Sequence, residues 1–328
     1  MSHTPVRYSK IVGTGSYLPE RILTNADLEK MVDTTDEWIQ SRTGIKARHI
    51  AAPEQATSDL ALAAALRAME MAGVTPQEID MIVVGTTTPD VVFPNVATIV
   101  QAALGIHDTP AFSIETACSS FMYALATADK FIKLGEAKCA LVIGAECLTR
   151  ILDWNDRATC VLFGDGAGAV ILKPAAEPGI LTTIVSADGQ YRDLLNYPMG
   201  ISKGFDRLRA GEPAALTMKG NEVFKVAVNT LSRLVDQTLA KANIRQEQID
   251  WLVPHQANLR IITAAAKKLS LPKEQVVVTV HQHGNTSAAS VPIALDTAVR
   301  DGRIKPGQLL LLEAFGGGFT WGSALVRF

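Results

Sequence analysis

Charge imbalance, long apolar runs and paired cysteines are all missing from this sequence, and each absence excludes a class of protein. Lysine and arginine total 31 and aspartate and glutamate total 33, so the formal net charge is −2 at pH 7. This balance argues against non-specific binding to nucleic acid, and an anionic partner would have to be met by a local basic patch. No apolar run approaches the roughly 20 residues that span a membrane, and residues 1–10 lack the apolar core of a signal peptide. We therefore expect a cytoplasmic protein that acts on neither nucleic acid nor a membrane.

The cysteines and the first glycine-rich segment also lack the spacing of known ligand sites. Cys118, Cys139, Cys147 and Cys160 form no CxxC pair and no metal-ligand pattern, so we expect reduced thiols and no structural metal. Gly164–Gly168 lacks the lysine of a phosphate-binding loop and precedes an apolar strand pattern instead of a helix. This segment predicts a tight turn or close backbone packing.

The chain repeats one pattern of elements. Residues 77–84 echo residues 247–254, and each segment follows an amphipathic helical pattern. Further on, a strand, Cys118, a helix and a strand parallel a strand, Asn285, a helix and a strand. Cys118 and Asn285 are therefore predicted to occupy equivalent positions in two similar halves.

Strands that alternate with helices and carry near-continuous apolar runs predict largely parallel sheets that are covered on both faces. With 328 residues, of which 48% are hydrophobic, the chain exceeds what one core usually holds. We expect a layered α/β sandwich whose halves, residues 1–173 and 174–328, meet at a proline-rich junction. Residues 190–213 predict a long surface loop. The first helix is expected to begin near Thr57 or Ser58 and to end at Gly73, with one apolar face that comprises Leu62, Leu66 and Met69.

Cys118 stands between an apolar strand pattern over residues 111–116 and a helical pattern over residues 120–134. Unpaired N–H groups and the positive end of the helix dipole stabilise a thiolate at such a junction. The pKa of Cys118 is therefore expected to fall from about 8.5 toward or below neutrality, which would make it a nucleophile. A buried, inert cysteine is the alternative that this position alone leaves open.

Two further apolar runs end on polar side chains, at His255 with Asn258 and at Asn285. Parallel strands place their sites at one edge of the sheet, so a Cys-His-Asn constellation is predicted there. Residues 316–318 are three adjacent glycines that follow another strand pattern, and their exposed N–H groups could complete an oxyanion hole with the amide of Cys118.

These residues resemble the thiolase superfamily and, closely, β-ketoacyl-acyl carrier protein synthase III of type II fatty acid synthesis. The resemblance runs nearly end to end, and its most specific segments are Thr35–Ile39, Arg42–Ile45, Phe163–Gly168, Pro254–Asn258, Gly284–Ser290 and Gly316–Gly322. It implies a thiolase-like αβαβα sandwich with Cys118 as the nucleophile and His255 and Asn285 as its catalytic partners. The backbone amides of Cys118 and Gly317 would form the oxyanion hole.

The resemblance also implies an acyltransferase. Cys118 would take the acyl group of an acyl-CoA primer, most simply acetyl-CoA. Malonyl-acyl carrier protein would then lose CO2 and attack that acyl group, which gives a 3-ketoacyl-acyl carrier protein without metal or bound cofactor. His281 and His283 flank Asn285 but do not match the two-histidine pattern of elongating condensing enzymes.

Binding residues follow from the same resemblance. Trp38 and Arg157 would sandwich the CoA adenine, and Arg42 would lie near its phosphates. The pantetheine tunnel would be lined by Gly220 and Asn258, with Phe315 beside the catalytic cysteine and histidine. Phe93 would enter the acyl pocket of the partner in a homodimer. A basic patch for acyl carrier protein would comprise Lys225, Arg260, Lys267 and Lys268.

Three alternatives remain open at this point. Ser119 and Ser120 follow the nucleophile where many relatives carry a glycine at the second position, which favours a paralogue that uses medium-chain primers or makes a secondary metabolite. A non-catalytic paralogue that binds acyl-CoA or carrier protein would not need the paired His255 and Asn285. A papain-like hydrolase also uses Cys, His and Asn, but its nucleophile lies near the mature N-terminus in a different local sequence.

Overall fold

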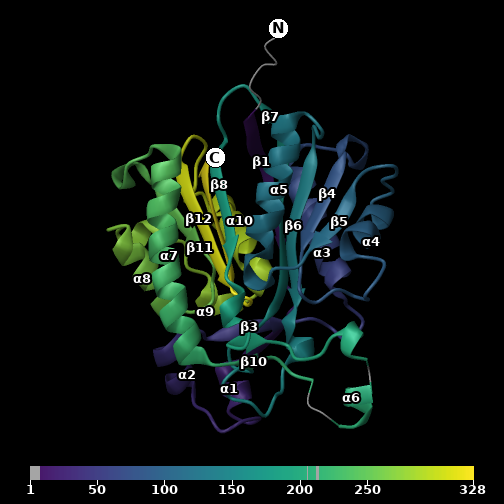
Figure 1. The fold of residues 1–328 in the computed structure, drawn as a ribbon, viewed down its shortest axis with the longest axis vertical. Coiled ribbons are helices and arrows are strands. Elements are labelled where there is room, and N and C mark those ends of the chain that lie inside the picture. The colour runs from purple at the N-terminus through teal and green to yellow at the C-terminus, as the bar shows by residue number, and fades with distance from the viewer. Residues whose placement is uncertain (1–7, 205, 212–213) are drawn as a thin grey trace.

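The structure is a computed structural model that describes residues 8–204, 206–211 and 214–328. The chain forms two main β-sheets side by side, with helices between them and on their outer faces (Figure 1). Residues 1–7, which belong to the segment where we expect no signal peptide, lie outside the described ranges. Within those ranges, no helix is long and apolar enough to cross a membrane.

The first sheet contains β1 (Tyr8–Tyr17), β4 (Met81–Gly85), β5 (Ala111–Ile114), β6 (Ala140–Cys147) and β7 (Asp165–Ala175). Their order is β1-β7-β6-β4-β5. Strand β4 runs parallel to β5 and β6, whereas β7 is antiparallel to both of its neighbours. Residues of β4 and β6 are buried on both faces, which accounts for their unbroken apolar runs.

The second sheet contains β8 (Ile180–Ala187), β11 (Trp251–Pro254), β12 (Leu309–Gly316) and β13 (Thr320–Arg327). Their order is β11-β12-β13-β8, and only β11 and β12 are parallel. The prediction of largely parallel sheets is therefore wrong. An apolar run indicates only that both faces of a strand are covered. Parallel and antiparallel strands can both be covered in this way, so the run does not predict the direction of the strand.

Helices α5 (Ser120–Leu134) and α10 (Ser290–Arg300) lie between the two sheets (Figure 1). Phe121 and Leu295 from these helices share one core with strand residues of both sheets, among them Val142 and Leu312. The outer face of the first sheet is covered by α3 (Thr57–Ala72) and α4 (Val96–Ala103), and that of the second by α7 (Gly220–Ala242) and α8 (Leu259–Lys268). The layers thus alternate as helix, sheet, helix, sheet and helix, as the resemblance implied.

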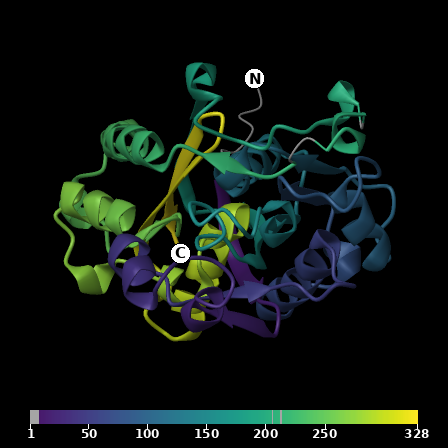
Figure 2. The same cartoon turned by 90° about the horizontal axis from the view of Figure 1, so that it is seen from below.

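Short elements gather at one end of the sheets, the lower end in Figure 1, which Figure 2 shows from below. They are β2 (Arg21–Thr24), α1 (Asn25–Leu28), α2 (Asp36–Thr43), β3 (Ala47–Ile50), β9 (Leu195–Asn196), α6 (Asp206–Arg209), β10 (Thr217–Met218) and α9 (Val280–His283). β9 and β10 pair antiparallel, so the segment predicted as one long loop at residues 190–213 carries a short ribbon strand and a helical turn. Phe205, Glu212 and Pro213 of that segment lie outside the described residues.

The bounds of α3 agree with the sequence prediction, and its predicted apolar face is correct for Met69, which is buried, and for Leu62, which packs partly buried on the core, but wrong for Leu66. Leu66 is 51% exposed, and the helix instead buries a ridge of small residues that includes Ala61, Ala64, Ala65 and Ala68. The reason is the close approach of α3 to β1. A Cβ atom added at Gly15 would lie 2.3 Å from the backbone nitrogen of Ala68, so leucine would not fit along this contact.

The two halves repeat a 3-10 turn before the central helices, over Ala117–Ser119 before α5 and over Ser287–Ala289 before α10. The first residue of each turn has a φ of 48°. This repeat makes Ala288 the counterpart of Cys118, so the predicted equivalence of Cys118 and Asn285 is wrong by three residues. The predicted division after residue 173 falls inside β7, which continues to Ala175, and it stays a prediction.

Candidate active site

Cys118 lies in the turn between β5 and α5 and is 7% exposed. Burial raises the pKa of its thiol to about 12, and the charge of nearby Glu146 adds to the rise, whereas hydrogen bonding from Ser287 opposes it. The expectation of a pKa near or below neutrality is therefore wrong. The loss of hydration is the largest cause of this rise in pKa, and the resting side chain is a thiol.

The glycines at the end of β12 and directly after it pack on this turn. A Cβ atom at Gly316 would lie 2.6 Å from the backbone nitrogen of Cys118 and 3.0 Å from that of Ser119. Gly317 and Gly318 line the same cavity as Cys118. The fold thus places Gly317 and Cys118 on one cavity, while the oxyanion hole that their amides would form stays a prediction.

His255 follows β11, and its backbone nitrogen donates to the carbonyl oxygen of Glu313 at 2.8 Å. Its side chain is 6% exposed, and burial lowers its pKa to about 3, so the imidazole is neutral at physiological pH. The Nδ1 atom lies 2.5 Å from the hydroxyl oxygen of Ser290. A neutral imidazole in this position acts as a hydrogen-bonding group and not as a cation.

Asn285 is held by a backbone bridge to the segment before β7. Its nitrogen donates to Leu162 O at 2.8 Å, and its oxygen accepts from Gly164 N at 3.0 Å. The side-chain oxygen accepts from Ser287 N at 2.8 Å. Because a backbone N–H can only donate, this contact identifies the oxygen of the amide and leaves the NH2 group to face the cavity.

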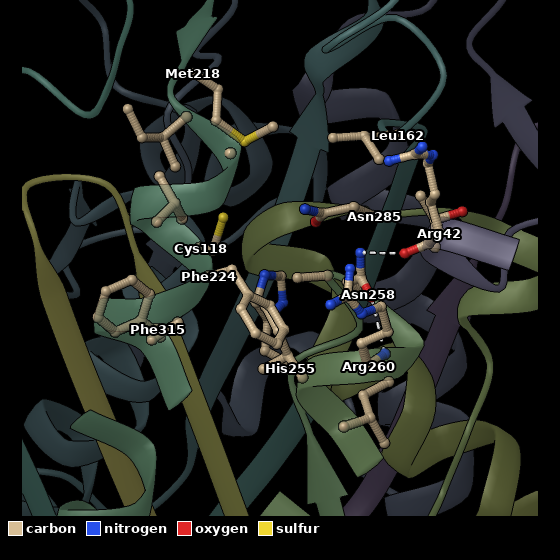
Figure 3. Close-up of a pocket in the computed structure, with 18 of the residues that line it drawn as sticks. Arg42, Cys118, Leu162, Met218, Phe224, His255, Asn258, Arg260, Asn285 and Phe315 are labelled. Atoms are coloured by element: carbon tan, nitrogen blue, oxygen red, sulfur yellow. Dashed lines mark hydrogen bonds between the residues drawn. The ribbon is translucent and has the colours of Figure 1, made fainter. Parts of the chain in front are cut away.

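Cys118, His255 and Asn285 point into one cavity of about 240 Å³ (Figure 3). The cavity also includes predicted binding residues, namely Trp38, Arg42, Gly220, Asn258, Arg260 and Phe315. A second cavity of about 460 Å³ meets Cys118 together with Leu148, Phe163 and Leu216. Cys118 therefore lies where two cavities meet, while His281 and His283 line neither of them.

Of the residues predicted to hold the nucleotide end of CoA, Trp38 and Arg42 line the first cavity, and Arg157 contacts Trp38 without being part of the lining. The guanidinium carbons of Arg42 and Arg157 each lie 4.8 Å from the ring centroid of Trp38. Arg157 therefore occupies the position where a flat ring would stack, so an adenine can enter between it and Trp38 only if one of the two moves. Asn258 donates from its side chain to Arg42 O at 3.1 Å (Figure 3).

The four predicted carrier-protein residues are exposed on α7 and α8. Arg260 lies 4.8 Å from the ring centroid of Phe224, and it lines the cavity. Lys268 forms an ion pair with Asp236 at 2.8 Å, which leaves Lys225 and Lys267 as the other exposed cations of the predicted set. Phe93 is 83% exposed in a protruding apolar loop with Val91 and Val92.

Sequence analysis missed two buried carboxyls near the site. Glu146 accepts hydrogen bonds from Thr87, Thr88 and Ser287, and burial raises its pKa to about 7. Glu313 lines the first cavity, and neither of its side-chain oxygens has a hydrogen-bond partner among the described residues. Burial raises its pKa to about 8. Both acids stand in apolar strand patterns, which is the signal that could have identified them.

Comparison with known proteins agrees with this geometry. The family model described as 3-oxoacyl-[acyl-carrier-protein (ACP)] synthase III matches residues 112–189, and the model of its C-terminal part matches residues 239–328. A β-ketoacyl-[acyl-carrier-protein] synthase III of Thioalkalivibrio sulfidiphilus is 64% identical over 321 residues, which are 98% of this chain and 99% of that protein. Fold and site together define a condensing enzyme of the thiolase-like class.

Two solved structures extend the comparison. The 3-oxoacyl-[acyl-carrier-protein] synthase III of Aquifex aeolicus is 48% identical, with a TM-score of 0.91 over 98% of this chain and 100% of that one. The priming β-ketosynthase of the R1128 polyketide pathway is 36% identical, with a TM-score of 0.94 over 99% of this chain and 98% of that one. The chain belongs to the 3-oxoacyl-acyl carrier protein synthase III family. It is accordingly an acyltransferase, and its reaction is the condensation that initiates fatty acid synthesis.

Proposed function

We propose that the chain condenses an acetyl primer, delivered as acetyl-CoA, with malonyl-acyl carrier protein, and that Cys118, His255 and Asn285 carry the reaction. The observation that carries this proposal is the convergence of these three side chains on one cavity (Figure 3). The thiol supplies a nucleophile, and the neutral imidazole and the amide supply hydrogen bonds to a developing enolate. The proposed reaction needs no metal and no bound cofactor.

In the first half of the reaction, the sulfur of Cys118 attacks the thioester carbon of the acyl-CoA. The tetrahedral oxygen accepts hydrogen bonds from the backbone amides of Cys118 and Gly317. The C–S bond to CoA then breaks, and the proton that leaves Cys118 ends on the CoA sulfur. A buried thiol with a raised pKa supports a transfer in which the proton leaves as the new bond forms.

In the second half, malonyl-acyl carrier protein enters the first cavity and its carboxylate leaves as CO2. The electron pair of the broken bond forms an enolate, whose oxygen accepts hydrogen bonds from His255 and from the NH2 group of Asn285. The carbon end attacks the acyl group on Cys118, and the Cys118 thiolate is expelled and takes up a proton. The product is a 3-ketoacyl-acyl carrier protein.

The binding roles belong to the same proposal. Trp38, Arg42 and Arg157 hold the nucleotide end of CoA once Arg157 has moved from the Trp38 ring, and the tunnel toward Cys118 takes the pantetheine arm. The exposed cations on α7 and α8 give an acidic carrier protein a surface beside the cavity mouth. Arg260 links this surface to the cavity itself.

A medium-chain primer is the second candidate, because the cavity of about 460 Å³ beside Cys118 is far larger than an acetyl group. We further propose a cytoplasmic homodimer in which the exposed loop of Phe93 closes the acyl cavity of its partner. An exposed apolar loop of this kind favours an interface over a solvated surface. Such closure would shorten the primer that fits.

The test is peptide-mapped mass spectrometry of the protein and its Cys118→Ser variant after incubation with acetyl-CoA or octanoyl-CoA. The proposal predicts that Cys118 carries the acyl group as a thioester. It also predicts that acetoacetyl-acyl carrier protein is released when malonyl-acyl carrier protein is added. If only octanoyl-CoA gives an adduct, the primer is a medium-chain acyl group and not acetyl. An acetyl adduct elsewhere than on Cys118, or no adduct with either CoA, would contradict the proposed chemistry and favour a binding paralogue.

A further inference from the structure

Ser290, the first residue of α10, contacts the imidazole of His255 through its hydroxyl group and does not line either cavity. Its hydroxyl oxygen lies 2.5 Å from His255 Nδ1 and accepts from Gln256 N at 3.3 Å. Ser290 is 1% exposed and lines neither cavity, so it cannot reach a substrate. Sequence analysis singled out the segment Gly284–Ser290 only for Asn285.

The two contacts of Ser290 decide where its proton goes. A backbone N–H can only donate, so the contact with Gln256 uses a lone pair of the serine oxygen. Within the described ranges, His255 Nδ1 is the one other polar partner of that oxygen. A protonated Nδ1 would leave the serine proton without an acceptor among the described residues, so the contact favours a neutral ring whose Nδ1 accepts the serine proton.

The corresponding serine of the other half shows that this arrangement does not follow from helix geometry. Ser120 begins α5 as Ser290 begins α10, and its oxygen likewise accepts from a backbone N–H, that of Thr116, at 2.8 Å. Ser120, however, donates its proton to Ala117 O at 2.7 Å, inside its own turn. Ser290 instead directs its proton out of the turn to His255.

The position of the imidazole relative to Ser290 is held by Gln256, the next residue in the chain. The side-chain nitrogen of Gln256 donates to Pro254 O at 2.8 Å and to Val277 O at 3.0 Å. Its side-chain oxygen accepts from Thr279 N at 2.8 Å and from Val280 N at 3.0 Å. These four bonds hold the turn after β11 at the position where the ring of His255 meets the hydroxyl of Ser290.

We propose that Ser290 is a positioning residue that holds neutral His255 in the tautomer with its proton on Nε2, directed at the substrate carbonyl. In this tautomer His255 donates a hydrogen bond to the enolate oxygen. In the other tautomer Nε2 would offer a lone pair to that oxygen and would repel it. The inference rests on the proposed role of His255 in decarboxylation and predicts no part for Ser290 in the acylation of Cys118.

The first arm of the test reads the tautomer in the unaltered protein. Nitrogen-15 NMR of histidine-labelled protein, with the His255 signals assigned from a His255→Gln variant, is expected to show a protonated Nε2 and an unprotonated Nδ1. A protonated Nδ1 in the resting protein would overturn the inference. This arm does not depend on whether any Ser290 variant folds.

The second arm separates the two half-reactions. Ser290→Ala should acylate Cys118 from acetyl-CoA within about twofold of the wild-type rate. Condensation with malonyl-acyl carrier protein should fall about tenfold to a hundredfold, the loss that is typical when a group that orients a metal-binding histidine is removed. Ser290→Thr keeps the hydroxyl and should restore condensation. Ser9→Ala removes another buried serine hydroxyl, which donates to Asp129 far from the cavities, and should leave both rates unchanged.

The outcomes distinguish this inference from the proposed function. If His255→Ala loses condensation and a folded Ser290→Ala keeps it, the proposed role of His255 survives and the inference about Ser290 is wrong. If His255→Ala condenses at the wild-type rate, the proposed role of His255 is wrong, and the inference about Ser290, which depends on it, is wrong as well. An equal loss of acylation and condensation in Ser290→Ala, without rescue by Ser290→Thr, would mean a structural role and would also overturn the inference.

Discussion

Gly316→Ala is the substitution that tests most directly how the end of β12 supports the nucleophile. The added Cβ atom would lie 2.6 Å from Cys118 N, roughly 0.8 Å less than the 3.4 Å at which ordinary contact begins. Its other close neighbours are Ser119 N and Thr116 O, each at 3.0 Å, so every atom in the way belongs to the backbone. No flexible side chain can move aside to relieve the clash, so the turn that carries Cys118 must itself move.

Two magnitudes follow from this displacement. Overpacking of a well-packed interior costs about 1–3 kcal/mol of the free energy of unfolding. A misplacement on the order of 1 Å at a reacting group lowers the rate by about a hundredfold. We therefore expect Gly316→Ala to remain folded, because such a loss is smaller than the stability of an ordinary protein, and to acylate Cys118 about a hundredfold more slowly.

The assay combines urea unfolding with the rate of Cys118 acylation from acetyl-CoA, followed by mass spectrometry. Gly189→Ala is the matched control, because a Cβ atom there would meet nothing within 4 Å. The control should change the free energy of unfolding by less than about 0.5 kcal/mol and leave acylation unaltered. A Gly316→Ala protein that acylates at the wild-type rate would refute the claim that this contact positions the nucleophile.

Three further predictions concern the site. Cys118→Ala should form no acyl adduct and yet decarboxylate malonyl-acyl carrier protein, because His255 and Asn285 remain; full condensation by this variant would end the nucleophile assignment. Asn285→Ala should be acylated normally but fail to condense, as measured by ketoacyl product, and a normal condensation rate would exclude its proposed role. Burial raises the pKa of Glu313 to about 8, so its carboxyl destabilises the folded state progressively as the pH rises from the usual value near 4.5 to about 8. Glu313→Gln should therefore flatten the loss of stability over this range in urea unfolding, whereas the same slope in both proteins would show that the carboxyl is not buried in solution.

Some features of the fold and site could be predicted because they depend on local sequence. The ends of α3 follow from residues near Thr57 and from Gly73, and the turn that carries Cys118 follows from a strand pattern running into a helical one. Motifs near Pro254 and Gly284 were sufficient to place His255 and Asn285 on the same cavity as Cys118, with the help of a family resemblance. Local hydrogen bonds and apolar periodicity decide such features, and both are visible along the chain.

Other features depend on which distant segments meet, and these become visible only in the folded protein. The direction of β7 and the alanine ridge of α3 come from packing against strands remote in sequence. The pKa of Cys118 reverses the sequence prediction because desolvation and the charge of Glu146 arise only once the chain is folded.

Residue type and local pattern along the chain are therefore enough to identify which side chains can react. The fold decided their protonation and their partners. The hydroxyl of Ser290 reaches His255 across 35 positions of the chain, while that of Ser120, in the same local setting, reaches only its own turn. Burial and long-range hydrogen bonds set the state of a titratable group, and neither exists before distant segments of the chain have packed together.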